Sequence, residues 1–166
     1  METEQIRIEN AAKNTDVLIS MLEHKNLKYT VEERTEARTH VRIRFTGKDL
    51  PMTLHIILRT DRQIVSVLSA MPFLISEEHR NDAAIAVTAA NHGLIDGSFD
   101  LNMKTGEIRF RLTSCFIETV LSEALFAYLM FVSAETIDRY NDRFCDLNEN
   151  KLDLEGFLAA DAADIR

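Results

Sequence analysis

The chain has 166 residues, 46% of them hydrophobic and 28% charged, which suits one globular domain and leaves little room for a second. Its formal net charge is -8, so we expect no nucleic-acid partner for the molecule as a whole. The charge is uneven, because residues 34–62 carry seven Lys/Arg and three Asp/Glu, whereas the remaining residues carry twelve and twenty-four.

The cellular compartment can also be inferred. The first residues, Met-Glu-Thr-Glu, have neither the basic segment nor the apolar run of a secretory signal. The most apolar stretch, residues 120–132, is shorter than the ~20 residues of a membrane span, so we expect no membrane partner. Cys115 and Cys145 are too few for a disulfide framework. We therefore expect a cytoplasmic protein with two reduced thiols.

The first predicted helix begins at Asn14 or Thr15, either of which can cap it, with Asp16 in the first turn. Its apolar residues recur with the i, i+3, i+4 spacing of one helix face, and it is expected to end near Asn26. These apolar residues are Val17, Leu18, Met21 and Leu22. Residues 1–13 carry too few apolar side chains for a core, which predicts a loosely docked N-terminal segment.

Apolar and polar residues alternate after residue 27, which predicts a meander of antiparallel strands at residues 29–31, 41–45, 52–59 and 63–70. Pro72 is expected to end the last of them. A sheet with one buried and one wet side produces such alternation. The predicted buried face consists of Val41, Ile43, Phe45, Met52, Leu54, Ile56 and Leu58.

A second helix is predicted over about residues 77–92, capped by Ser76 and ended by Gly93 in the left-handed conformation. Two strands follow, at residues 98–102 and 107–112. They are joined by a short turn in which Gly106 takes a positive φ.

The last large element is predicted to be an apolar helix from about Phe116 to Phe144. One stripe, from Ile117 to Val132, is expected to face the sheet. A second stripe must be covered either by the N-terminal helix or by a second copy of the chain, and it is our candidate homodimer contact. It consists of Phe126, Met130, Phe131 and Ile137. Residues 147–166 are expected to form an acidic C-terminal extension with one or two helical turns.

Together these elements predict an α+β fold, with helices packed on one face of an antiparallel sheet in the order α-β-β-β(-β)-α-β-β-α. Residues 14–146 are expected to form the single domain. The order resembles that of the YbjN-like bacterial family, whose fold is similar to that of type III secretion chaperones. The likeness covers about residues 16–144 and is carried by VLISML at 17–22, LKY at 27–29, MP at 71–72, AAN at 89–91, GSFDLN at 97–102 and GEIRFR at 106–111.

The resemblance implies an α+β protein, often dimeric, that binds other proteins rather than turning over a substrate. It supplies no catalytic residues, and a secretion-chaperone role does not follow from likeness of fold alone.

We find no catalytic, metal or cofactor motif. Residues 146–150 begin like a calcium loop, but Lys151 stands where the loop needs glycine and Phe157 where it needs a bidentate glutamate. A solvated acidic connector is therefore expected. The five histidines lack metal-ligand spacing, although His40 and His55 are expected on adjacent strands. Cys115 with a distant histidine stays open as a nucleophile pair.

The polar face of the sheet is the most informative candidate site. Its projecting side chains are Arg42, Arg44, His55, Arg59, Arg109 and Arg111. One interpretation is a solvated charged surface that prevents edge-to-edge aggregation. The other is a docking surface for an acidic or extended partner, because arginine pairs with carboxylates in a bidentate manner.

We therefore expect a non-catalytic protein-binding module, an adaptor, regulator or chaperone-like protein, that uses no cofactor and forms a homodimer. One alternative is a dedicated secretion chaperone for an effector protein. Another is a small-molecule sensor or an enzyme, which a deep apolar cavity between helix and sheet with converging polar groups would favour.

Overall fold

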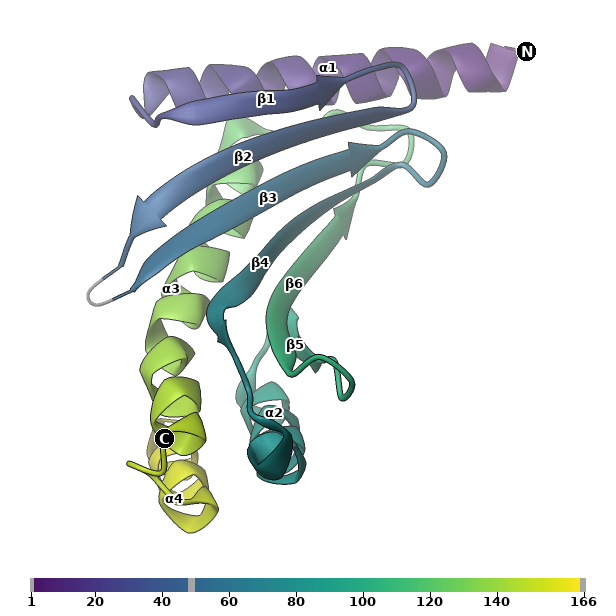
Figure 1. Cartoon of the computed structure of the whole chain (residues 1–166). Coiled ribbons are helices and arrows are strands. Elements are labelled where there is room, and N and C mark those ends of the chain that lie inside the picture. The colour runs from purple at the N-terminus through teal and green to yellow at the C-terminus, as the bar shows by residue number, and fades with distance from the viewer. Residues whose placement is uncertain (1, 48–49, 165–166) are drawn as a thin grey trace.

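The structure, a computed structural model, describes residues 2–47 and 50–164, and Figure 1 shows their arrangement. The elements in chain order are α1 (Glu2–His24), β1 (Tyr29–Arg34), β2 (Arg38–Thr46), β3 (Pro51–Arg59), β4 (Ile64–Leu74), η1 (Glu77–His79), α2 (Arg80–Gly93), β5 (Ser98–Leu101), β6 (Glu107–Cys115), α3 (Glu123–Asn148) and α4 (Leu154–Asp164). In the described part of the chain, no helix is both long and apolar enough to cross a membrane.

The strands of the described residues form one antiparallel sheet in the order β1-β2-β3-β4-β6-β5. Consecutive strands pair from β1 to β4. The chain then passes through α2, so that β6 pairs with β4 and β5 lies at the edge. α3 crosses behind the sheet in Figure 1 and contacts β3, β4 and β6. The predicted α+β fold with helices on one face of an antiparallel sheet is confirmed.

The core lies on the sheet face that α3 covers. Val41 of β2, Leu54 and Ile56 of β3 and Phe110 of β6 are fully buried there, as the alternation predicts. Phe45, close to the end of β2, is only partly buried. Each large apolar side chain stabilises the fold by roughly 1.5–3 kcal/mol on leaving water, so this face holds the helices against the sheet.

The N-terminal helix is longer than the sequence predicts. α1 begins at Glu2 and continues without a break into the segment that was expected to be loosely docked, residues 1–13, of which Met1 lies outside the described residues. Ala11 of this segment is buried in the core, whereas Ile6 is exposed. The segment is therefore the first part of α1, and its later turns pack against the domain.

Asn14 is not a helix cap. It lies inside α1, 0% exposed, and its side chain bonds the segment that precedes α3. Its Nδ2 donates to the backbone oxygens of Asn10 at 2.8 Å and Thr119 at 3.0 Å, and its Oδ1 accepts from the N–H of Leu121 at 2.8 Å. The cap prediction was wrong because a short amide bonds backbone groups equally well at a helix end and across a tertiary contact.

Pro72 does not end the fourth strand. β4 continues to Leu74, and its pairing with β6 is irregular between Ala70 and Leu74. A proline has no N–H to donate, so it fits where the ladder is interrupted. The strand bends past Pro72 rather than stopping there.

The second helix differs from the prediction at both ends. It begins as the 3-10 turn η1, and the Ser76 side chain makes no cap hydrogen bond. Gly93 is the last residue of α2 and does not take a positive φ. The prediction for Gly106 is confirmed: its φ is +80°, and a Cβ there would lie 2.0 Å from the carbonyl oxygen of Ile75.

α3 begins later than predicted. Ser122 caps it, with Oγ accepting from the N–H of Leu125 at 3.2 Å, and residues 116–122 are not helical. Ile117 and Val120, assigned to the sheet-facing stripe, are exposed. The predicted helix began too early because residues 116–122 include several apolar side chains, although they form a loop.

Most of the candidate homodimer contact is buried inside one chain. Phe126, Met130 and Ile137 are at most 2% exposed, because α1, α2, α4 and the sheet all contact α3. Only Phe131 of the four is exposed, at 37%, and the Lys25 ammonium lies 5.5 Å from its ring centroid. The prediction was wrong for the three buried residues. Packing within one chain, which the sequence left open as the alternative, buries these three residues.

α4 belongs to the fold rather than to an extension. Phe157 is fully buried, with its ring centroid 5.2 Å from that of Phe144 and 6.5 Å from that of Tyr140. Leu147, where the extension was expected to start, is a buried residue of α3. Leu147 and Phe157 therefore complete the core, and residues 165–166 lie outside the described range.

Candidate functional site

The candidate site is the sheet face opposite the helices. Strand pairing sets Arg42 beside His55, and Arg111 beside Leu68, which itself pairs with His55. Arg44, Arg59 and Arg109 fall on the same face by alternation. The structure thus brings all six predicted side chains to one face. It separates Arg42, Arg44 and His55 from Arg59, Arg109 and Arg111, which line a hollow described below.

One group lies on β1, β2 and β3. His40 Nε2 and His55 Nδ1 are 2.9 Å apart, and the two rings are tilted by 40°. Arg42 Nε donates to Glu32 Oε1 at 2.5 Å. Burial, followed by the charges of His40 and Arg42, lowers the pKa of His55, and the hydrogen bond from Arg42 lowers the pKa of Glu32. If both imidazole rings were positively charged, two cations would be in contact.

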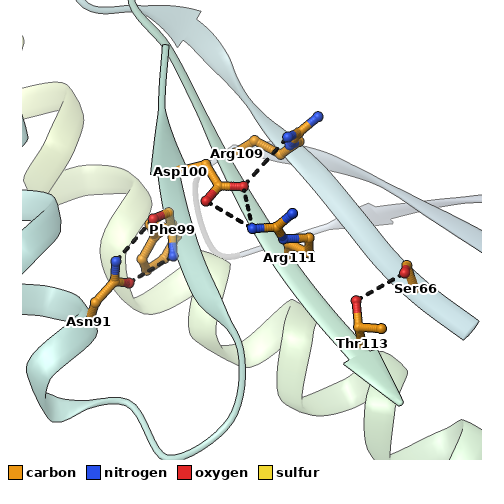
Figure 2. A network of polar contacts seen from close by, with 7 residues as sticks. All are labelled: Ser66, Asn91, Phe99, Asp100, Arg109, Arg111 and Thr113. Carbon is orange, nitrogen blue, oxygen red and sulfur yellow. Dashed lines mark hydrogen bonds and ion pairs between the residues drawn. The ribbon is translucent and has the colours of Figure 1, made fainter. Parts of the chain in front are cut away.

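The other group lies on β5 and β6 (Figure 2). Asp100 of β5 pairs with both neighbouring arginines: Arg111 Nη2 lies 3.2 Å from its Oδ2, and Arg109 Nη2 lies 3.5 Å from the same oxygen. Beside them the hydroxyls of Ser66 and Thr113 join β4 to β6 at 2.9 Å. The buried Nε of Arg109 has no hydrogen-bond partner in the described residues. This guanidinium is therefore incompletely satisfied by the fold.

Asn91 of α2 fixes β5 in place. Its side chain bonds the backbone of Phe99 twice, Nδ2 donating to the carbonyl oxygen at 3.0 Å and Oδ1 accepting from the N–H at 2.7 Å (Figure 2). The amide thus satisfies backbone groups of a short edge strand and holds Asp100, the next residue, beside the arginines of β6.

An open hollow of about 1580 Å³ lies over β3, β4 and β6 and extends to the β1–β2 turn and the first turns of α1, and we call it the sheet hollow. Its floor contains the half-buried Ile57, Ile64 and Leu68, which are diagonal neighbours on β3 and β4. The charged residues that line it are Glu4, Arg7, Glu33, Glu36, Arg38, Arg59, Asp61, Arg62, Arg109 and Arg111. Six arginines face four carboxylates there, so the hollow is mildly basic in a chain of net charge -8.

The predicted residues do not all line the sheet hollow. Arg59, Arg109 and Arg111 belong to it, whereas Arg42, Arg44 and His55 lie outside. Arg59 Nη2 donates to Asp61 Oδ2 at 3.0 Å, and the hydrogen bonding from Arg59 lowers the pKa of Asp61.

The histidine pair predicts a pH dependence of stability. The pKa of His55 is lower in the folded chain than in the unfolded chain, so the unfolded chain binds more protons below about pH 6.5. Stability should therefore fall as the pH is lowered through this range. His55→Gln should reduce that fall, as measured by urea unfolding at pH 7.5 and pH 5.

His24 supplies a control of opposite sign. Its hydrogen bond to Glu123 raises its pKa, so its contribution is present below about pH 6.5 and is lost as the pH rises. His24→Gln should therefore steepen the loss of stability on acidification, by a small amount because the side chain is 71% exposed. Equal pH profiles for His55→Gln and the wild type would contradict the assignment.

The residues considered for metal and nucleophile chemistry are placed as follows. Within residues 2–47 and 50–164, no group of three or more His, Cys, Asp or Glu side chains is placed to hold a metal ion. The segment that begins like a calcium loop overlaps the end of α3. Its Asn148 accepts a hydrogen bond from the N–H of Ser76 and donates one to the carbonyl oxygen of Leu74. Cys115 is exposed at the end of β6 and makes no hydrogen bond to a histidine of the described chain.

Sequence reasoning missed two parts of this site. Asp100 was read only as part of a hairpin, although alternation along β5 already placed it on the arginine face. The N-terminal turns of α1, which bring Glu4 and Arg7 to the rim of the sheet hollow, carried no signal, because their residues show no apolar periodicity.

Comparison with known proteins supports the fold. No family model and no curated protein matches the chain. Among solved structures it is similar to YbjN from E. coli, described as a proposed transcription regulator. The two share 11% sequence identity with a TM-score of 0.57, over 75% of this chain and 85% of YbjN. At this identity the likeness shows the fold alone, and to that extent the predicted resemblance is confirmed.

Proposed function

We propose that the protein is a non-catalytic protein-binding module that holds a segment of another protein in the sheet hollow. One observation carries the proposal: apolar side chains form the floor of a large open hollow, and arginines stand around it. Small-molecule sites usually measure about 300–1,000 Å³. A hollow of about 1580 Å³ is larger and suits a polypeptide better.

The lining indicates the chemistry of the partner. Ile57, Ile64 and Leu68 would bury apolar side chains of the partner, and arginine is enriched among residues that dominate binding energy at protein interfaces. Arg109 and Arg111 share one carboxylate, and Arg109 lacks a partner for its Nε in the described residues. Both arginine side chains are partly exposed, so a carboxylate of a partner can pair with them from the solvent side. The favoured partner is therefore a segment with both apolar and acidic side chains.

Charge reversal inside the hollow tests the proposal. Arg59→Glu with Arg111→Glu should lower capture of partner proteins from the source cell by about tenfold or more, because like charges would then face an acidic segment. Capture is measured by affinity purification and quantitative mass spectrometry.

The matched control reverses two charges elsewhere. Arg44→Glu with Arg139→Glu carries the same change in net charge on residues that do not line the hollow. This variant should keep the captured proteins of the wild type. Proteins captured equally by all three forms would contradict docking in the hollow, and so would a wild type that enriches none.

The alternative functions expected from the sequence remain proposals, and fewer observations support them. A secretion chaperone would use the same hollow for an unfolded effector, and a regulator comparable to the description of YbjN would use it for a regulatory partner. A homodimer formed through α3 would use its exposed side chains, such as Tyr128 and Phe131, because the other predicted contact residues are buried.

A further inference from the structure

A second hollow lies between α2 and α4. These helices pack against each other at the bottom of Figure 1. Its volume is about 630 Å³, within the range of small-molecule sites. We call it the helix groove. It is lined by Ala84, Ile85, Thr88, Ala89, His92, Leu158, Asp161 and Ala162. Ile85 and Leu158 are both exposed along it, so the groove is mostly apolar.

One carboxylate interrupts this apolar lining. Asp161 is only 3% exposed, although it carries one of the most strongly hydrated groups in proteins. Tyr140 donates its hydroxyl hydrogen to Asp161 Oδ1 at 2.5 Å, and burial together with this bond raises the pKa of Tyr140. Oδ2 receives no hydrogen bond from the described residues, and Asp161 forms no ion pair with them.

Arg143 is the cation beside Tyr140. It lies over the Tyr140 ring at 5.5 Å, and its Nη2 contacts Asp164 Oδ2 at 2.6 Å, whereas its buried Nη1 has no hydrogen-bond partner in the described residues. A buried carboxylate is normally paired or fully hydrogen-bonded, because burying an uncompensated charge is strongly unfavourable. Asp161 thus has one oxygen for which the described part of the fold supplies no donor, at the wall of an apolar groove.

We propose that the helix groove binds a small amphiphilic amine, whose ammonium group contacts Asp161 Oδ2 while its apolar body lies between α2 and α4. The ammonium supplies a donor for this oxygen, and its positive charge strengthens that hydrogen bond. Ile85, Leu158 and the alanines supply apolar contact for a chain or ring. This site is separate from the sheet hollow and does not depend on the proposed protein partner.

Three probes of equal chain length test the charge preference. Octylamine, 1-octanol and octanoate are titrated into the ¹⁵N-labelled full chain at pH 7, and amide shifts are followed by NMR. Octylamine should shift the amides of Ala84, Thr88 and Asp161 and bind about tenfold more tightly than octanol, and octanoate should not bind.

Variants separate the groove from general attraction to an acidic protein. Asp161→Asn keeps the acceptor for Tyr140 but removes the charge, so octylamine should bind it no better than octanol. Glu155→Gln removes one exposed charge from the same helix and should leave the preference intact. Ala89→Leu should fill the groove and weaken both probes.

The proposal would be overturned if octylamine and octanol bind the wild type equally, if neither shifts groove amides, or if Asp161→Asn retains the preference. Circular dichroism of each variant confirms that it is folded. Capture of protein partners by the sheet hollow should be unchanged in Asp161→Asn, so the two proposals fail independently.

Discussion

Replacing Phe157 by alanine is expected to lower the free energy of unfolding by about 3–5 kcal/mol, the usual cost of deleting a buried aromatic ring. Phe157 is fully buried, and its ring packs on Phe144 and Tyr140, which in turn contact Phe99 of β5. The ring thus joins α4 to α3 and, through α3, to the edge of the sheet. Because small domains are stable by only about 5–15 kcal/mol, the variant should unfold at much lower urea concentration.

The neighbouring residue provides the control. Leu158 is 36% exposed, so Leu158→Ala should cost less than about 1 kcal/mol. Both variants are compared by urea unfolding monitored by circular dichroism. If Phe157→Ala cost no more than Leu158→Ala, α4 would be a separable extension rather than part of the core.

Replacing Asn14 by alanine is expected to cost about 3 kcal/mol. The change removes three hydrogen bonds and leaves the N–H of Leu121 and the carbonyl oxygen of Thr119 without their partner. Each buried polar group left unsatisfied costs about 1–3 kcal/mol. The variant should also loosen residues 116–122, because Asn14 ties that segment to α1.

Two measurements check this expectation. Urea unfolding gives the cost, and hydrogen exchange of the Leu121 amide should speed up in Asn14→Ala before global unfolding. Lys13→Ala, an exposed neighbour on α1, should change neither quantity. Unaltered exchange at Leu121 would show that Asn14 does not hold this segment.

The order of elements and the buried face could be predicted from the sequence, because periodicity is set by burial. Val41, Leu54 and Phe110 repeat every second residue on one side of their strands, and a sheet has to bury that side. Gly106 could be predicted because few other residues accept its φ of +80°.

Helix ends were harder to predict, since tertiary contacts decide them. Asn14 resembles a cap but bonds a loop more than a hundred residues away in sequence. Ile117 and Val120 are apolar but exposed, and the predicted helix wrongly included them. The helix itself begins after its cap, Ser122. Phe157 lies in an acidic segment whose composition hides a buried ring.

The sheet face that carries the candidate arginines could be predicted, but the hollow on that face could not. Alternation placed the arginines on one face, as the strand register confirms. The hollow depends on where α1 begins and on how the strands bend, and neither follows from a two-residue period. For the same reason the sequence could not separate Arg59 and Arg111 from Arg44, or show that Asp100 pairs with Arg109 and Arg111.

Site-specific photo-crosslinking in the source cell tests most directly whether the sheet hollow holds a protein partner. A photoreactive amino acid replaces Thr113, an exposed residue of the hollow, and in a second strain it replaces Arg139 on α3. We predict a discrete crosslinked species from position 113 that is lost when Arg59 and Arg111 are changed to Glu. Crosslinks from position 139 but none from position 113 would contradict docking in the hollow.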